Sequence, residues 1–189
     1  MTKKELRQKL RRQVAQVSSD ELHERGALAC ARLVEQPEYR RAEVVMIFLS
    51  MSNEVDTGPI ALHSWSNMRR VLAPKVSWEQ RRMLPTEIHS LTSDVRDGVL
   101  GVREPIDGLP IPVADIDLVV VPGLGFDAVG NRVGRGRGFY DRFLSHRDFR
   151  GVACALALED QVVATVPREE NDVRVHMLVT DVRVRRFKR

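Results

Sequence analysis

The chain has 189 residues, of which 43% are hydrophobic and 30% are charged, a balance typical of a folded globular protein and not of a disordered one. No apolar run approaches the roughly 20 residues that a membrane-spanning helix needs. The basic start of the chain also lacks the apolar core of an export signal. We therefore expect a cytoplasmic protein with one domain over residues 1–189.

The net charge of +4 favours an anionic ligand without identifying it. The two cysteines, Cys30 and Cys154, have no partner at metal-ligand spacing. In a reducing compartment, free buried thiols are the expected state of such residues. Composition thus excludes a disulfide framework and a cysteine metal cluster, and it leaves the class of ligand open.

Two helices are predicted at the start of the chain. Residues 2–17 begin with a capping box at Thr2 and Glu5. The basic side chains around this helix indicate, on their own, a solvated basic surface. A second helix begins at Ser18 or Ser19 and ends before the next proline. The apolar stripe of the first helix is formed by Leu6, Leu10, Val14 and Val17.

The first strong strand signal is the apolar run at residues 44–49, which leads into a polar loop at residues 50–57. Ligands of open α/β sheets bind at such strand ends. A crossover helix at residues 58–68 and a strand at residues 70–74 are expected next.

Lys75 follows the strand at residues 70–74 and is a candidate anion contact at the same edge of the sheet. Residues 76–89 are charged and irregular, which indicates a paired outer strand and a variable loop. The prolines that follow keep the connecting segment extended.

The most informative stretch covers residues 115–147. Its apolar run at residues 118–121 is rich in β-branched residues and too short for a helix, which indicates a buried strand of a parallel sheet. A long glycine-rich connection follows, and from Phe139 the apolar residues recur at helical spacing. A strand, a glycine loop and a helix start together form an anion-binding geometry.

The chemistry of this loop favours phosphate. Gly134, Gly136 and Gly138 have no Cβ, so main-chain N–H groups can approach an anion closely. Arg135 and Arg137 alternate with the glycines and supply forked donors that match phosphate oxygens. The pattern alone leaves a flexible turn and a solvated or RNA-binding loop open, because neither common phosphate-loop motif is present.

The last third of the chain predicts three more strands, at residues 151–158, 161–166 and 177–180, followed by a basic tail. We interpret the tail as a solvated end and not as an RNA clamp. Strand and helix segments alternate as a parallel sheet requires. The predicted fold is a single three-layer α/β/α domain with a mainly parallel, Rossmann-like sheet.

Residues 121–144 read VPGLGFDAVGNRVGRGRGFYDRFL. This string closely resembles the signature of the 5-formyltetrahydrofolate cyclo-ligase family, from V-P-G-L-x-F-D to G-x-R-x-G-x-G-x-G-[FY]-Y-D. Chance agreement over so long a pattern is very unlikely. The sheet topology of that family agrees with the alternation of segments in this chain.

The resemblance implies an ATP site that begins on the first helix. Members of the family open with a K-x-x-L-R type helix whose basic side chains reach the phosphates, and the matching candidates are Lys3, Lys4 and Arg7. One sequence does not decide which lysine of the pair acts. The glycine loop supplies the rest of the implied ATP site: Arg132, Val133, Gly134, Arg135, Gly136, Arg137, Gly138, Phe139 and Tyr140.

The family's F-L-S-x-x-x-E-[IV]-x-T arrangement recurs at residues 48–57. It implies that Leu49 and Glu54 contact the folate, with Glu54 hydrogen-bonding the polar edges of the pterin. From the residues alone, Glu54 is an exposed loop carboxylate or a helix cap. Residues 101–105 resemble the G-[IV]-x-E-P element that lines the folate pocket. The loop residues shared with the folate are Arg135, Gly136, Arg137, Gly138 and Phe139.

A magnesium site is implied near the start of the last helix, where Asp141 lies one turn in. An aspartate there can also serve only to complement the helix dipole. Many family members carry V-P-x-x-x-x-D-x-x-x-D near the end of the chain, and His176 stands at its final position here. Imidazole is a poor ligand for a hard cation. Asp172 remains, so Asp141 and Asp172 are the predicted metal ligands.

The implied reaction is ATP-dependent closure of 5-formyltetrahydrofolate, with or without a polyglutamate tail, to 5,10-methenyltetrahydrofolate. Phosphorylation of the formyl oxygen gives an iminium phosphate, N10 attacks the activated carbon, and phosphate leaves. Such chemistry needs alignment and charge neutralisation more than a protein nucleophile. Arg135, Arg137 and Tyr140 are the implied catalytic residues, whereas Phe139 is equally well read as a core residue.

Two other classes of function stay open. One is a different phosphate-handling enzyme on a related α/β scaffold, because fold does not fix chemistry. The other is a basic RNA-binding module, which predicts aromatic stacking platforms. Aromatic residues are only 5% of the chain and mostly follow apolar patterns, so the RNA-binding class ranks far behind. We expect neither a nucleic acid nor a membrane as a partner.

Overall fold

A seven-stranded sheet forms the centre of the molecule, which we describe from a computed structural model over residues 1–188. The strand order is β11-β10-β9-β6-β1-β2-β3, and all five inner strands run parallel. Only the two edge strands are antiparallel. The predicted α/β fold with a mainly parallel sheet is confirmed. The strands are β1 (Val44–Met46), β2 (Arg70–Ser77), β3 (Arg82–Ile88), β6 (Leu118–Val121), β9 (Val152–Ala157), β10 (Met177–Thr180) and β11 (Val184–Arg186).

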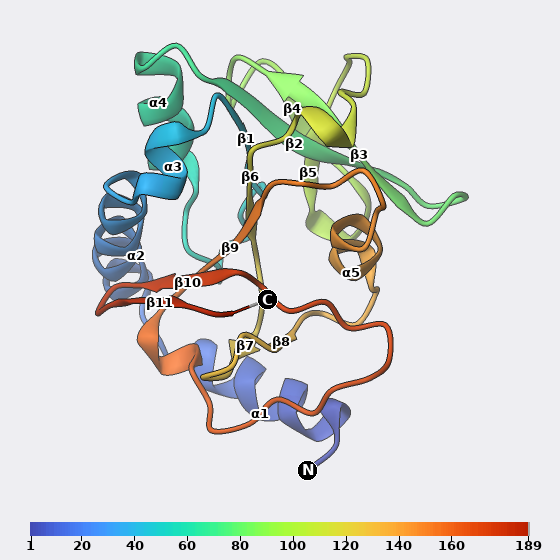
Figure 1. Cartoon of the computed structure of the whole chain (residues 1–189). Coiled ribbons are helices and arrows are strands. Elements are labelled where there is room, and N and C mark those ends of the chain that lie inside the picture. The colour runs from blue at the N-terminus through green and yellow to red at the C-terminus, as the bar shows by residue number, and fades with distance from the viewer. Residues whose placement is uncertain (189) are drawn as a thin grey trace.

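Helices cover both faces of the sheet (Figure 1). One face packs against α2, α3 and α4, and the other packs against α5. The inner strands are apolar throughout because both faces are buried: all four residues of β6 are inaccessible to solvent. The helices are α1 (Lys3–Val14), α2 (Ser19–Val34), α3 (Pro37–Arg41), α4 (Gly58–Ser66) and α5 (Phe139–Leu144), with short 3₁₀ turns at Val99–Gly101, Val113–Asp115 and Glu159–Gln161.

Helix α1 lies apart from the two sheet faces, across the carboxyl ends of the strands (Figure 1). The predicted capping box at Thr2 and Glu5 starts it, and its stripe buries Leu6 and Leu10. These leucines pack with Leu124, Val133 and Val166 in a small core of their own. Its basic side chains are therefore held above the strand ends, where ligands of such sheets bind.

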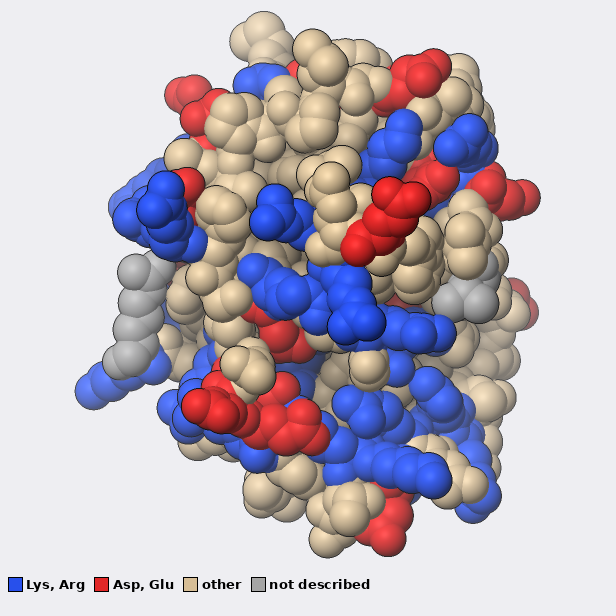
Figure 2. All heavy atoms as spheres, turned by 90° about the vertical axis from the view of Figure 1, so that its right-hand side faces the viewer, with Lys and Arg blue, Asp and Glu red and all other residues tan. Residues whose placement is uncertain are grey.

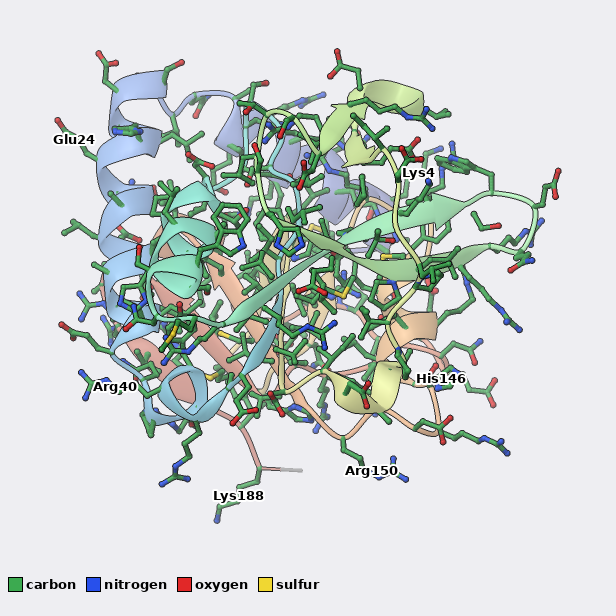
Figure 3. All side chains as sticks on the ribbon, turned by 90° about the horizontal axis from the view of Figure 1, so that it is seen from above. Lys4, Glu24, Arg40, His146, Arg150 and Lys188 are labelled. Carbon is green, nitrogen blue, oxygen red and sulfur yellow. The ribbon has the colours of Figure 1, made fainter. Side chains whose placement is uncertain are left out.

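Two small hairpins complete the molecule near those strand ends. β4 (Val95–Asp97) pairs with β5 (Arg103–Pro105), and β7 (Gly125–Phe126) pairs with β8 (Arg132–Val133). Charged side chains such as Glu24, Arg40 and Lys188 point outward at the periphery (Figure 3). No helix in the described part of the chain is long and apolar enough to cross a membrane.

Most predicted segments form where the patterns place them, and the outer strand expected within residues 76–89 is β3. Helix α3 was not predicted; it begins at a proline, whose fixed φ suits the first helical position. Both cysteines are free and buried, as expected. Burial raises the pKa of the Cys30 thiol to about 12, which leaves it protonated and unreactive near neutral pH.

Two predictions for the end of the chain are wrong. Residues 161–166 do not form a strand: Val162 makes only an isolated bridge, and the Gln161 side chain bonds Leu158 N and Gly123 O in place of a ladder. The basic tail is not simply solvated, because it forms edge strand β11. Long-range contacts hold it there, among them the ion pair from Arg186 to Glu38 at 2.7 Å.

Candidate functional site

A cavity of about 980 Å³ opens at the carboxyl ends of β1 and β6. From β1 the chain continues to β2 on one side, and from β6 it continues to β9 on the other, so this is the topological switch point of the sheet. Walls of the cavity come from α1, the glycine loop, the β2–β3 hairpin, the segment around β5 and residues 169–173. Figure 2 shows Lys and Arg side chains gathered on this face, with a compact acidic group among them.

The glycine loop has the backbone that an anion site needs. Gly136 and Gly138 have φ values of +100° and +67°, which residues other than glycine rarely adopt. Gly138 is also the residue that caps α5. Arg7 of α1 donates from Nε to Gly134 O at 3.0 Å, and its guanidinium lies where a Cβ on Gly136 would be in contact. Helix α1 therefore holds the loop in shape across the cavity.

Arg132 is a buried arginine in the wall of the cavity, with 8% of its surface exposed. Its Nη2 donates to Asp141 Oδ1 at 2.9 Å, while its buried Nε has no hydrogen-bond partner among the residues described. Gly134 makes room for it, since a Cβ there would lie 2.6 Å from Arg132 Nη1. A buried, partly unsatisfied cation facing a cavity suits an anionic ligand.

Lys3 and Lys4 have different positions. Lys3 is 8% exposed, lines the cavity, and donates from Nζ to Asp172 Oδ1 at 2.7 Å. It also pairs with Glu169 at 3.2 Å. Lys4 is exposed and is not among the lining residues. The structure thus places only the first lysine of the pair, together with Arg7, at the cavity.

Glu54 and Arg135 meet across the cavity. Arg135 donates from Nη2 to Glu54 Oε1 at 2.9 Å and to Asn53 Oδ1 at 3.0 Å. Glu54 also accepts from Met51 N through its second oxygen. Leu49 lies buried at the adjacent strand end. Glu54 is thus neither a free loop carboxylate nor a helix cap.

The remaining loop residues of the prediction, from Val133 to Tyr140, all line the cavity. Burial, and secondarily the charge of Glu54, raises the pKa of Tyr140 above its usual value near 10. Its phenol therefore stays neutral at ordinary pH and can act as a hydrogen-bonding group but not as a phenolate. Phe139 faces both the cavity and the sheet core, so the two interpretations of its role coexist.

Asp141 and Asp172 line the same cavity. Asp141 accepts from Arg132 and from Val173 N at 3.3 Å, while Asp172 is paired with Lys3. Across residues 1–188 no group of three or more His, Cys, Asp or Glu converges as a complete metal cage. Two carboxylates beside an anion site nevertheless fit a magnesium ion, which commonly uses one or two carboxylates with phosphates and water.

His176 and Lys75 lie outside the cavity. His176 Nδ1 accepts a hydrogen bond from Ala153 N at 2.8 Å, so it supports strand β9. Lys75 donates to Ile106 O at 2.8 Å, so its ammonium supports the connecting segment.

Among the lining residues that sequence reasoning missed, two groups carried a signal in the sequence. One is Arg11, which follows Arg7 on the same face of α1 at the i+4 spacing that should have marked it. The other is the end of the β2–β3 hairpin, including Trp78. A tryptophan in a segment otherwise charged and irregular was the available signal. Val102, Arg103 and Glu104, within the predicted element at residues 101–105, also line the cavity.

Comparisons with known proteins agree with one another. Residues 1–181 match the model of the 5-formyltetrahydrofolate cyclo-ligase family. The chain is 28% identical over 186 residues to the mouse protein named 5-formyltetrahydrofolate cyclo-ligase, covering 92% of this chain and 90% of that protein. It is 29% identical over 172 residues to the Escherichia coli K12 protein of the same name, covering 89% of this chain and 94% of that protein.

Solved structures are similar over almost the whole chain. The solution structure of Aquifex aeolicus 5,10-methenyltetrahydrofolate synthetase aligns with a TM-score of 0.86 and 30% identity, covering 100% of this chain and 94% of that one. A Mycoplasma pneumoniae protein of that name aligns with a TM-score of 0.78 at 18% identity, covering 96% of this chain and 99% of that one, which shows a shared fold.

Proposed function

This chain belongs to the 5-formyltetrahydrofolate cyclo-ligase family and is a ligase of that kind, and we propose that it closes 5-formyltetrahydrofolate to 5,10-methenyltetrahydrofolate with ATP and magnesium. ADP and phosphate are the other products. The enzyme works in the cytoplasm as one domain over residues 1–189, on folate with or without a polyglutamate tail. Neither a nucleic acid nor a membrane takes part.

One observation supports this function most directly. At the switch point of the sheet, cations of α1 and of the glycine loop line one cavity, and the buried Arg132 Nε there has no partner within the described residues. Lys3 and Arg7 come from α1, and Arg135 and Arg137 from the loop. This arrangement suits a triphosphate held along its length.

In the first step the formyl oxygen attacks the γ-phosphorus, and the bond from that phosphorus to ADP breaks. Arg135 and Arg137 neutralise the charge on the moving phosphoryl group, and the loop N–H groups fix its orientation. Asp141 and Asp172 are the residues that would hold magnesium, and the ion would screen the charge of the phosphates. Arg132 and Lys3 now bond these two carboxylates. When ATP is bound, they would bond phosphate oxygens in their place.

In the second step N10 attacks the formyl carbon of the iminium phosphate, the carbon–oxygen bond breaks, and phosphate leaves with the proton lost from N10. The protein's task here is alignment. Leu49 supplies apolar contact at the strand end, and Glu54 orients the pterin through its polar edge. Tyr140 stays neutral and hydrogen-bonds without becoming charged.

The test is the near-ultraviolet absorbance of the purified protein with 5-formyltetrahydrofolate and magnesium, with and without ATP. Growth of the methenyl chromophore only when ATP is present is the expected result. If ATP binds and no chromophore appears, the chain is a different phosphate-handling enzyme on this scaffold. Replacing magnesium by a chelator should stop the reaction.

A further inference from the structure

The end of the β2–β3 hairpin contributes an aromatic residue to the wall of the cavity. Trp78 directly follows β2, lines the cavity and remains 39% exposed. Its ring stands edge-on to Phe139, with ring centroids 5.3 Å apart at 88°. Trp78 is thus a partly exposed aromatic residue beside the glycine loop, with the large apolar surface that aromatic ligands contact.

Arg142 of α5 joins the hairpin turn that carries Trp78 to the glycine loop. Arg142 donates from Nε to Arg81 O at 2.8 Å in the hairpin turn and from Nη2 to Arg137 O at 2.9 Å in the loop. Its guanidinium also lies 5.1 Å from the centroid of the Phe139 ring. Hairpin and loop therefore form one wall.

Arg137 depends on this wall more than the other loop arginines do. Arg132 and Arg135 each donate to a carboxylate. The guanidinium of Arg137 has no hydrogen bond or ion pair within residues 1–188; its recorded contact is the Trp78 ring, 5.8 Å from Cζ to the ring centroid. A cation over the face of an indole is attracted by the ring quadrupole. Trp78 is thus the side chain recorded in contact with the Arg137 guanidinium.

The surroundings of Trp78 indicate which ligand meets it. Four apolar residues of β2, β3 and the segment before β5 also line the cavity: Pro74, Val76, Met83 and Val102. Helix α1, which lies below the β2–β3 hairpin in Figure 1, contributes Lys3, Arg7 and Arg11 to the lining of the cavity. A polyphosphate fits the cationic side, and an aromatic ring system fits the apolar side.

We propose that Trp78 is a substrate-contacting and positioning residue of this site, which stacks against the ring system of the folate and holds Arg137 toward the glycine loop. This inference rests on the proposed function for the identity of the ligand.

The first experiment is a fluorescence titration, for which the chain is well suited because it has two tryptophans. Trp65 does not line the cavity; it donates to Ile88 O at 3.2 Å against the core. In W65F the emission therefore comes from Trp78. Titration with 5-formyltetrahydrofolate, without ATP, should give a saturable change in that emission. The matched control is W78F, in which Trp65 is the reporter. Its emission should change only because the added ligand absorbs light.

The second experiment is steady-state kinetics. W78A should raise KM for 5-formyltetrahydrofolate about tenfold, as loss of an aromatic stacking partner does, and should leave KM for ATP within about twofold. W78F should restore most of the folate affinity. Because Trp78 orients Arg137, W78A should also lower kcat, and in an R137A background that kcat effect should disappear while the KM effect remains.

A flat titration of W65F, or W78A with wild-type KM for the folate, overturns the assignment. Equal rises in both KM values also overturn it, since the residue would then act only on the fold. The failure of the proposed function gives a different result: the wild-type protein would form no chromophore with ATP. The fluorescence titration still decides the folate contact in that case, because it requires no turnover.

Discussion

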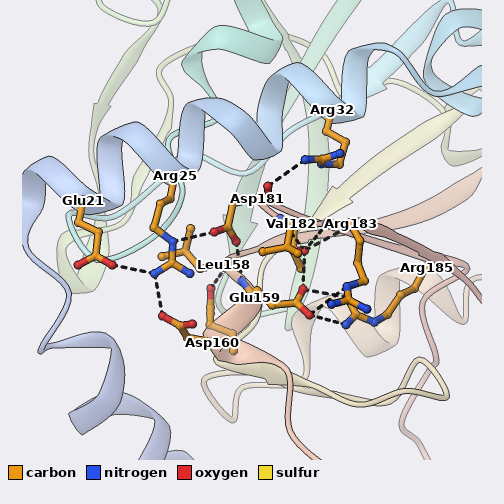
Figure 4. Close-up of polar contacts among 12 residues, drawn as sticks. Glu21, Arg25, Arg32, Leu158, Glu159, Asp160, Asp181, Val182, Arg183 and Arg185 are labelled. Atoms are coloured by element: carbon orange, nitrogen blue, oxygen red, sulfur yellow. Dashed lines mark hydrogen bonds and ion pairs between the residues drawn. The ribbon is translucent and has the colours of Figure 1, made fainter.

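Two charged regions near the carboxyl ends of the strands have similar composition and different connectivity. The first, the α2 network, joins helix α2 to the turn between β10 and β11 (Figure 4). Arg25 contacts three carboxylates, and Glu159 accepts from Arg185 and Thr180. The α2 network consists of Glu21, Arg25, Arg32, Glu159, Asp160, Thr180, Asp181, Arg183 and Arg185.

The second region is the set of site pairs: Lys3 with Asp172, Arg132 with Asp141, and Arg135 with Glu54. Every member lines the cavity, while no member of the α2 network does. The carboxylates of the α2 network all pair with arginines of that network, an arrangement that supports the fold. Pairs that face a cavity can exchange partners for a ligand. The difference between the regions lies in what each charge faces and not in residue type.

The sharpest test of this distinction removes Arg137 or Asp141 from the cavity wall. R137A or D141A should lower kcat by about 100- to 1,000-fold, as loss of a donor or ligand to a developing charge does. The thermal unfolding midpoint of R137A should stay near the wild-type value, whereas that of D141A should fall, because the buried Arg132 guanidinium loses its carboxylate partner. The rate of chromophore growth with saturating substrates measures kcat. R147A, on an arginine that is almost fully exposed and outside the cavity, is the matched control. Wild-type turnover in R137A or D141A would remove that residue from the site.

The next largest effect concerns Glu54. E54Q keeps the shape of the side chain and removes its charge, so KM for 5-formyltetrahydrofolate should rise by about 10- to 100-fold, the cost of weakening a charge-assisted hydrogen bond. N53A is the control, because Asn53 also bonds Arg135 but does not line the cavity. If the two variants raised KM equally, the cause would be the lost contact to Arg135 and not a lost contact to the folate.

A smaller difference should separate Lys3 from Lys4. K3A should raise KM for ATP about tenfold because a buried cation beside the anion site is lost. K4A should change it by less than about twofold, since an exposed charge is screened. Both values come from ATP titrations at fixed folate. If K4A had the larger effect, the assignment of the ATP contact to Lys3 would be wrong.

The smallest change in activity should come from the α2 network. The Arg185 guanidinium lowers the pKa of Glu159 to about 2. Because the folded-state pKa is depressed, Glu159 stabilises the fold above its unfolded pKa, and that contribution is lost as the pH falls toward 2. E159Q should reduce the free energy of unfolding by about 1–2 kcal/mol at neutral pH, with partial exposure limiting the effect.

Denaturant titrations of E159Q and the wild type at neutral and acidic pH test this. The two stabilities should converge as the pH falls, and kcat should not differ. E21Q, at the exposed end of the network, is the control. A parallel loss of stability at both pH values would show that the charge of Glu159 is not the cause.

Local patterns in the sequence predicted a large share of this protein. The capping box at Thr2, the buried strand at residues 118–121 and the glycine loop depend on neighbours a few residues apart, so one sequence displays them. The α/β class and the family resemblance followed from such features. The predictions for residues 161–166 and for the basic tail were wrong because distant partners, Gly123 and Glu38 among them, set their structure.

Tertiary structure alone decided which charges meet. Lys3 bonds Asp172, 169 residues away, and Arg135 bonds Glu54, 81 residues away. No local spacing encodes such pairs, and none distinguishes Lys3 from the equally basic Lys4. The same holds for Trp78, which reaches the cavity only because β3 returns the chain beside α5. The sequence by itself determined the elements and the loop chemistry, while the packing of strands far apart in the chain determined which side chains share the cavity.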